Sequence, residues 1–130
     1  MIKHSKKTTG EIGENYTSEY LKQHGYQILE RNYRKPYGEI DIIAFKDNTI
    51  AFVEVKTRHV GSLTQPYEAV DLKKQKRLIK TASVYLGENK TDSFCRFDVS
   101  EVYTDSVTQK PVKIHYIENA FEMGEGNAYY

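Results

Sequence analysis

Three charged residues, Asp41, Glu54 and Lys56, lie within the two most apolar segments of the sequence. These segments, residues 39–45 and 50–57, are rich in isoleucine, valine and phenylalanine, and a short polar stretch separates them. Such a pattern predicts two antiparallel strands joined by a tight turn. Because strands this apolar belong at the centre of a sheet, charged residues within them need a purpose, and we expect chemistry here.

The register of this hairpin decides whether the charges meet. If the intervening turn has an even number of residues, Asp41 lies opposite Glu54, and Glu39 lies opposite Lys56. Two carboxylates with Cβ atoms about 4.5–5.5 Å apart destabilise a sheet unless a cation lies between them. Hard divalent cations take carboxylate oxygens together with water and phosphate. The pair therefore predicts a site for Mg²⁺ (or Mn²⁺).

Lys56 follows Glu54 by two residues on the same strand face, about 7 Å further along, so its ammonium can reach a bound phosphate or water. Two other interpretations remain open. Glu39 and Lys56 can form an ordinary cross-strand ion pair, with Asp41 and Glu54 on a solvated face. A three-residue bulged turn would shift the register by one residue and separate the two carboxylates.

A helix is predicted before the hairpin. Thr8 or Thr9 can cap its start, and Gly25 is expected to end it after His24. On a helical wheel Glu14 falls at the rim of the more apolar side. Glu14 is therefore a candidate catalytic residue and a third carboxylate for the site.

The remaining segments complete an α/β domain. We expect a first strand over residues 26–33, a long amphipathic helix over 67–86 that ends before Gly87, and two more strands over 95–103 and 112–118. The element order is then α-β-β-β-α-β-β.

Length and composition favour a single folded domain. The chain has 130 residues, of which 38% are hydrophobic and 28% charged, a balance typical of soluble globular proteins. We expect a flexible basic N-terminus over residues 1–8, one domain over 9–118 and a loose C-terminal tail over 119–130. No apolar run approaches the roughly 20 residues that cross a bilayer, and a single cysteine, Cys95, suits a reducing compartment. A cytoplasmic location without membrane contact is predicted.

Positive charge is concentrated in the larger part of the chain. Residues 1–90 carry 16 lysines and arginines against 11 acidic residues, whereas residues 91–130 carry 3 against 7. Basic residues beside a carboxylate site favour a nucleic-acid partner, although a solvated lysine face is the common alternative. The candidates lie in loops flanking the hairpin and on the long helix: Arg34, Lys35, Arg58, Lys73, Lys76 and Arg77.

Two further polar residues have more than one interpretation. Gln75 falls within the apolar side of the long helix, where an amide needs partners. It is a candidate catalytic residue if it reaches toward Lys56 or a substrate phosphate, and otherwise a satisfied buried amide. Asp98 alternates with apolar residues on a predicted strand, where pairing with Arg96 or a backbone amide is favoured over catalysis.

Two strings resemble the signature of the YraN family of small bacterial proteins, which is similar to archaeal Holliday junction resolvases: GEIDIIA at residues 38–44 and FVEVKTR at 52–58. Weaker matches extend over roughly residues 9–122. The resemblance implies a restriction-endonuclease-like fold, in which helices flank a central mixed β-sheet. Ile40 replaces the proline that gives the PD-(D/E)xK motif of that superfamily its name.

The resemblance also implies roles. Asp41 is the aspartate of the PD motif, and Glu54 and Lys56 are the acidic residue and lysine of (D/E)xK. Glu14 matches a helix glutamate of resolvase-like members. In that interpretation Asp41, Glu54 and the backbone carbonyl of Val55 hold Mg²⁺, which activates a water for attack on phosphorus. Lys56 orients the water or stabilises charge that develops on the phosphate.

The expected function is metal-dependent hydrolysis of phosphodiester bonds, and the resolvase resemblance implies branched or otherwise structured DNA as substrate. It also favours a homodimer, although no sequence feature identifies a dimer surface. Two alternatives come from other classes. One is a nucleic-acid-binding or scaffolding protein that keeps the fold without the activity. The other is a structural interaction protein, which a net charge of only +1 favours.

Overall fold

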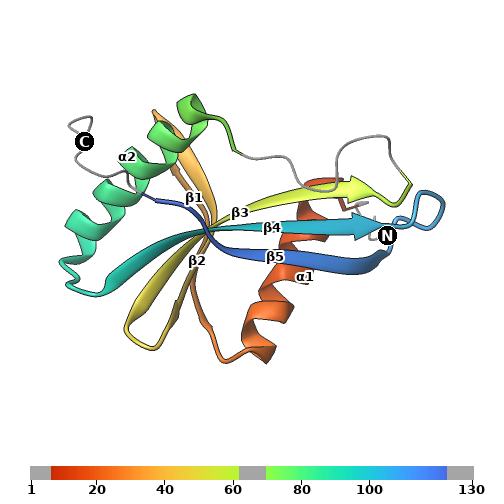
Figure 1. Ribbon diagram of the computed structural model, residues 1–130, viewed down its shortest axis with the longest axis horizontal. Coiled ribbons are helices and arrows are strands. Elements are labelled where there is room, and N and C mark those ends of the chain that lie inside the picture. Colours follow the sequence, from red (N-terminus) through yellow and green to blue (C-terminus); the bar gives the residue numbers. More distant parts are fainter. Residues whose placement is uncertain (1–6, 62–69, 123–130) are drawn as a thin grey trace, which may run out of the picture.

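The computed structural model describes residues 7–61 and 70–122, and its elements follow the predicted order α-β-β-β-α-β-β. Two helices and five strands make up this part of the chain (Figure 1). They are α1 (Thr9–Gln23), β1 (Gln27–Lys35), β2 (Gly38–Lys46), β3 (Thr49–His59), α2 (Leu72–Asn89), β4 (Phe94–Thr104) and β5 (Pro111–Phe121).

One mixed sheet contains all five strands in the order β1-β2-β3-β4-β5. Strands β3 and β4 run parallel, and the other neighbours pair antiparallel. A parallel pair requires a crossover connection, and α2 lies in that crossover. Helix α1 packs on one face of the sheet and α2 on the other (Figure 1), so the fold has three layers.

The sheet buries a different core on each face. The α2 side is rich in large aromatic rings: Phe52 stacks on Phe97 with ring centroids 5.5 Å apart, and Tyr85 meets Phe52 edge to face. The α1 side consists of smaller aliphatic side chains around Leu21, which is fully buried. Alternation along β2 and β3 separates the two sets. The buried strand residues on the α1 side are Ile42, Ala44, Ala51 and Val53.

Helix α1 begins and ends as predicted. Thr8 and Glu11 form a capping box, in which the backbone N–H of each donates to the side chain of the other. At the other end Gly25 has a left-handed φ of 88°. The N–H of Tyr26 donates to the carbonyl of Leu21 at 2.9 Å, an arrangement that ends helices.

The start of α2 is set by a side-chain cap. The Asp71 carboxylate accepts the backbone N–H of Lys74 at 2.8 Å, so the helix begins at Leu72. The expected start at residue 67 lies outside the described residues. Within the described ranges, neither helix is long and apolar enough to cross a membrane.

The predicted end of α2 before Gly87 is wrong. The helix continues to Asn89, whose side-chain amide donates to the carbonyl of Tyr85 at 2.9 Å, and it ends where Lys90 adopts a left-handed φ of 48°. Gly87 is exposed, and no atom lies within 4 Å of the position a Cβ would take. A glycine in such a place weakens a helix without stopping it.

Strand β5 also extends beyond its expected end. It runs to Phe121, so residues 119–121, expected in the loose tail, belong to the sheet. Phe121 stacks on Phe97 of β4 with ring centroids 5.0 Å apart. An aromatic pair contributes about 0.5–1.5 kcal/mol beyond its buried area, and this contact holds the end of the strand.

Candidate active site

A two-residue turn sets the register of the β2–β3 hairpin. Asp47 and Asn48 both have left-handed backbone, with φ of 51° and 56°, as a type I′ turn requires. The register is the predicted one, with Ile43 opposite Phe52. The bulged turn that would have separated the carboxylates does not occur.

The ladder between these strands stops one pair before the carboxylates. Its last pair is Ile42 with Val53. The prediction that Asp41 and Glu54 pair across the ladder is therefore wrong. Instead, the carboxylate of Asp41 accepts the backbone N–H of Val55 at 2.8 Å. The two strands part here, and a side-chain oxygen takes the place of a backbone acceptor.

Both carboxylates line one pocket of about 670 Å³, formed by the turn between β1 and β2, the adjoining end of β2, part of β3 and the first half of α2. We refer to it as the carboxylate pocket. Glu54 is buried, with 7% of its surface exposed, and Asp41 is half-buried. Four cations and one aromatic ring are also in its lining: Arg34, Lys35, Lys74, Arg77 and Tyr37.

The carboxyl of Asp41 is electrostatically perturbed. Burial raises its pKa to about 7, and the negative charge of Glu54 acts in the same direction. Glu14 and Glu39 add smaller contributions, while the hydrogen bond from Val55 opposes the shift. A group with this pKa is about half protonated at neutral pH. A cation held between the two carboxylates would favour the ionised form.

Lys74, which sequence reasoning did not select, contacts Glu54 directly. Its ammonium forms an ion pair with the Glu54 carboxylate. Burial lowers the pKa of Lys74, but the hydrogen bond and the charge of Glu54 outweigh burial, so the pKa is raised. The sequence held one indication of this contact: Lys74 lies one turn before Leu78, on the buried side of α2. A lysine on that side points toward the protein.

Arg34, Lys35 and Arg77 lie beside the carboxylates, where the prediction placed them. Arg34 pairs with Glu39 at 3.1 Å, and Lys35 with Glu88 of α2 at 2.8 Å. Pairs this exposed contribute little, so an anionic ligand can compete for both cations. Their binding to nucleic acid stays a prediction.

Lys56 and Gln75 are not in the lining of this pocket. Lys56 lies on the same face of β3 as Glu54, as predicted, and is half-buried. Gln75 donates from its amide to the carbonyl of Val70 at 2.7 Å. It is thus the satisfied amide of the alternative interpretation, and it ties α2 to the segment that precedes it.

Glu14 lies on α1 beside β1. Its carboxylate accepts the amide of Asn32 at 3.1 Å and lies 3.6 Å from the guanidinium of Arg31. In the part of the chain that the structure describes, no three acidic, histidine or cysteine side chains are close enough to hold a metal ion together. Glu14 acts on Asp41 through its charge, and its role as a third carboxylate of the site stays a prediction.

The other predicted phosphate-binding residues lie outside the pocket. Arg58 belongs to β3 rather than to a loop, and its guanidinium lies 3.6 Å from the fully buried carboxylate of Glu101. The Arg58 side chain is only 12% exposed, and breaking a buried pair is costly, so this contact stabilises the sheet, while the binding of Arg58 to nucleic acid stays a prediction. Lys73 and Lys76 are exposed on α2.

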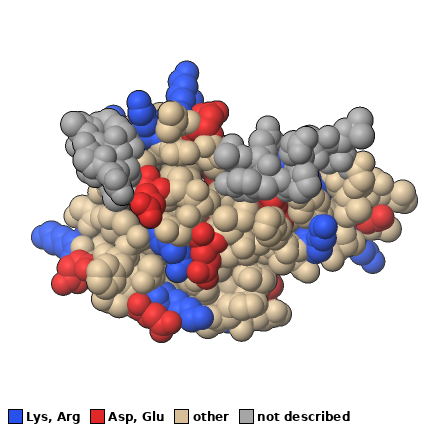
Figure 2. Space-filling model, viewed as in Figure 1, with Lys and Arg blue, Asp and Glu red and all other residues tan. Residues whose placement is uncertain are grey.

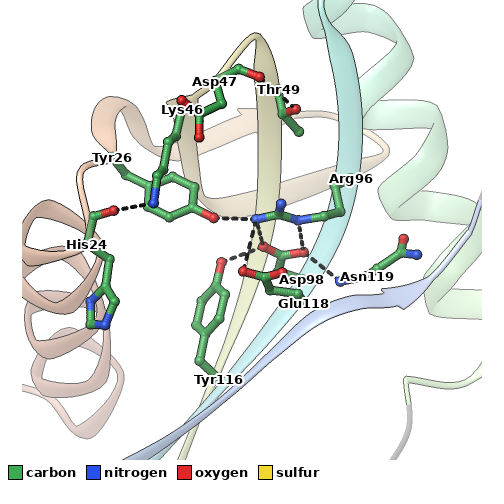
Figure 3. A network of polar contacts seen from close by, with 10 residues as sticks. All are labelled: His24, Tyr26, Lys46, Asp47, Thr49, Arg96, Asp98, Tyr116, Glu118 and Asn119. Carbon is green, nitrogen blue, oxygen red and sulfur yellow. Dashed lines mark hydrogen bonds and ion pairs between the residues drawn. The ribbon is translucent and has the colours of Figure 1, made fainter.

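A second polar network surrounds Asp98 of β4 (Figure 3). Arg96 donates to both its oxygens, at 2.8 and 2.9 Å, which confirms the predicted pairing. The Tyr116 hydroxyl and the backbone N–H of Asn119 donate to the same carboxylate at 2.6 and 2.9 Å. Arg96 also donates to the hydroxyl of Tyr26. This fully buried carboxylate joins β4 to β5 and, through Arg96, to the segment between α1 and β1, and it is structural.

The positive charge of residues 1–90 is more narrowly distributed in the structure than the sequence suggested. Basic and acidic side chains are interspersed over the face shown in Figure 2, so the positive excess of residues 1–90 forms no broad basic face there. Helix α2 is different, since it carries five cations and a single acidic residue, Glu88, near its end. Positive charge is therefore concentrated along this helix.

Comparisons with known proteins place these features within one family. Residues 13–102 match the model of a family described as "Uncharacterised protein family UPF0102". A UPF0102 protein of Alkaliphilus metalliredigens is 49% identical over 116 residues, covering 88% of this chain and 98% of its own length. A UPF0102 protein of Caldanaerobacter subterraneus subsp. tengcongensis is 43% identical over 122 residues, covering 93% and 100%. The matched span contains every residue that lines the carboxylate pocket.

Proposed function

The chain belongs to the UPF0102 family, and we propose that it is a metal-dependent nuclease in which Asp41 and Glu54 serve the hydrolysis of phosphodiester bonds. One observation carries the proposal. Where β2 and β3 part, Asp41 accepts the N–H of Val55 and shares a cation-lined pocket with Glu54. We further propose that the sheet is a restriction-endonuclease-like core, related to that of the resolvases, and that the substrate is branched or otherwise structured DNA.

The donor set of the pocket fits Mg²⁺ or Mn²⁺. Asp41 and Glu54 in its lining, with the backbone carbonyl of Val55, the residue after Glu54, would offer hard oxygen ligands and leave positions open for water and phosphate. Burial and the charge of Glu54 raise the pKa of Asp41, and a divalent cation would offset both effects. When bound, such an ion polarises a phosphoryl oxygen and lowers the pKa of a water molecule.

The other residues bind the phosphate and stabilise its charge. Arg34 and Arg77 line the pocket, and guanidinium groups match the geometry of phosphate oxygens. Lys56, two residues beyond Glu54, supports the charge that develops on the phosphate. In the reaction a water oxygen bonds to phosphorus, the bond to the leaving sugar oxygen breaks, and that oxygen takes a proton.

Cleavage of labelled DNA tests this function, with a four-way junction, a flap, a duplex and a single strand as substrates in Mg²⁺ or Mn²⁺. Asp41→Asn and Glu54→Gln are expected to lower the rate at least about 100-fold, and Lys56→Ala to lower it strongly. Glu19→Gln removes an exposed carboxylate of α1 and should leave the rate unchanged. Full activity in both carboxylate variants would refute the site.

A non-catalytic nucleic-acid-binding protein is the second candidate, and the ion pair between Lys74 and Glu54 favours it. An ammonium already neutralises a carboxylate that a metal would need. Such a protein binds DNA equally in EDTA and in Mg²⁺, cuts no substrate and gives no heat when titrated with Mn²⁺. Calorimetric titration therefore distinguishes the two candidates without a cleavage assay.

A further inference from the structure

Tyr37 lines two neighbouring cavities. One is the carboxylate pocket, and the other, of about 750 Å³, lies along the outer side of α2. Arg77 also lines both, so the two cavities meet at these two residues. Each has a volume within the roughly 300–1,000 Å³ of typical ligand sites.

The fold holds Tyr37 against α2. Tyr37 belongs to the two-residue turn between β1 and β2, in which Lys35 pairs with Gly38. A Cβ at Gly38 would lie 2.7 Å from the hydroxyl of Thr81 on α2, so a larger residue would force the turn or Thr81 to shift. The approach brings the turn onto the helix, where the ammonium of Lys80 lies 4.7 Å from the centroid of the Tyr37 ring.

The second cavity combines cations with an aromatic ring. Lys76, Arg77 and Lys80 are exposed in its lining, and among the described residues no acidic side chain lines it. Ile79 adds a buried apolar surface. Cations beside an aromatic ring bind the phosphates and the base face of an unpaired nucleotide. A duplex hides its base faces, so this arrangement selects single strands.

We propose that this basic groove, defined by Tyr37, Lys76, Arg77 and Lys80, binds a single-stranded segment of nucleic acid that leads into the carboxylate pocket. A base stacks on Tyr37, and the flanking phosphates lie against the cations. The placement of the scissile phosphate rests on the proposed nuclease function, whereas binding in the groove does not. The substrates are then nucleic acids with an unpaired arm, such as a flap or a fork.

Binding without cleavage tests the groove. The affinity for a fluorescein-labelled oligothymidylate of about 12 nucleotides is measured by fluorescence anisotropy in EDTA, beside a blunt duplex of the same length. Tyr37→Ala is expected to weaken single-strand binding about 5- to 100-fold and to change duplex binding less than about twofold. Tyr37→Phe keeps the ring and should retain the wild-type affinity.

Matched controls come from a similar pair elsewhere on the sheet. The ammonium of Lys113 lies 4.8 Å from the centroid of the Tyr103 ring, on β5 and β4, and neither residue lines the groove. Lys113→Ala and Tyr103→Ala should leave both affinities unchanged. Should Tyr37→Ala fail to fold by circular dichroism, Lys76→Ala with Lys80→Ala, both at exposed positions, tests the same surface with the same expected loss.

Three results would each overturn the proposal: unchanged single-strand affinity in the groove variants, no measurable binding of the oligothymidylate by the wild type, or equal losses for single strands and duplexes. Failure of the nuclease proposal is distinguishable from these. Binding of single strands through Tyr37 without any cleavage would support the groove proposal and refute the nuclease proposal. Cleavage of DNA together with single-strand binding that does not depend on Tyr37 would support the nuclease proposal and refute the groove proposal.

Discussion

The carboxylate of Asp41 accepts the backbone N–H of Val55 at 2.8 Å, immediately beyond the last paired residues of β2 and β3. This acceptor satisfies a donor that would otherwise lose its partner where the strands part. It also fixes Asp41 beside the strand that carries Glu54. One side chain thus maintains the local fold and contributes to the proposed site; both roles favour its ionised form, whereas burial and the charge of Glu54 favour the neutral form.

Asp41→Asn should stabilise the protein at alkaline pH. Burial and the charge of Glu54 raise the pKa of Asp41 to about 7, against about 3.9 in an unfolded chain. Between these values the native state binds more protons than the unfolded state, so stability falls as pH rises through this window. Asparagine keeps an acceptor for Val55 and stays neutral. The variant should exceed the wild type by about 2–4 kcal/mol at pH 8.

Urea denaturation at pH 8 and pH 4 measures this difference. At pH 4 both proteins should agree within about 1 kcal/mol, because Asp41 is then protonated in the native state and partly protonated in the unfolded state. Glu19→Gln, at an exposed site, should show little change at either pH. A gain in Asp41→Asn that is the same at both pH values would mean that ionisation is not its cause.

Lys74→Met should make stability depend more strongly on divalent metal. The substitution replaces the unbranched aliphatic stem of lysine with an unbranched side chain that has no charge. It leaves the carboxylate of Glu54, 7% exposed, without this ion-pair partner. Breaking a buried pair costs about 3–5 kcal/mol; since the Lys74 side chain is 50% exposed, we expect a loss of about 1–3 kcal/mol. Bound Mn²⁺ would restore a positive charge beside Glu54, and ligands that bind the native state stabilise it.

Thermal denaturation with and without Mn²⁺ checks this prediction. The melting temperature should rise more in Lys74→Met than in the wild type, because no ammonium competes for Glu54. Lys73→Met changes the exposed neighbour on α2 and should respond to Mn²⁺ as the wild type does. An identical Mn²⁺ shift in all three proteins would exclude competition between Lys74 and a metal.

The hairpin was predictable because its determinants are local. Alternation of apolar residues and a two-residue turn set the register of β2 and β3, and caps within a few residues set the ends of α1. Membership of the YraN family was also predictable from the two motifs of the hairpin. The match of residues 13–102 to UPF0102, which is the YraN family, confirms it. The nuclease activity and the relationship to resolvases stay predictions.

The contact of Lys74 with Glu54 in this pocket was not predictable because it depends on the crossover of α2. Lys74 reaches Glu54 only where that helix lies across the sheet, and no local pattern encodes the crossing. Arg58 was expected in a loop because its strand was expected to end at Thr57. Parallel pairing with β4 extends β3 to His59, so Arg58 is half-buried within the sheet instead.

Gly13→Ala should destabilise the domain because α1 touches β3 at this residue. A Cβ there would overlap the hydroxyl of Thr57 and lie 3.2 Å from the Val55 side chain. Overpacking of this kind costs about 1–3 kcal/mol, which offsets the gain of roughly 1 kcal/mol in helix propensity. Gly10→Ala is the matched control in the same helix, since its nearest neighbour would be 4.0 Å away. Urea denaturation should show a net loss for Gly13→Ala and a small gain for Gly10→Ala; gains in both would exclude the close approach.

Asp98→Asn should lower stability without affecting the proposed chemistry. The fully buried carboxylate accepts hydrogen bonds from Arg96, Tyr116 and the backbone of Asn119. An amide in its place leaves the guanidinium with the more distant carboxylate of Glu118, 4.0 Å away, as its ion-pair partner, and turns a donor toward other donors. Removing one partner of a buried ion pair costs about 3–5 kcal/mol, measured here as a shift in the urea midpoint at constant slope.

The cleavage rate, measured where the variant is still fully folded, separates this structural role from a catalytic one. Asp98 does not line the carboxylate pocket, so the rate per folded molecule should stay within about twofold of the wild type. Asp105→Asn removes a carboxylate outside the core that accepts the backbone N–H of Thr108 at 2.8 Å, and it should lower stability much less than Asp98→Asn. An Asp98→Asn protein with wild-type stability and lost cleavage would show instead that the Asp98 network belongs to the active site.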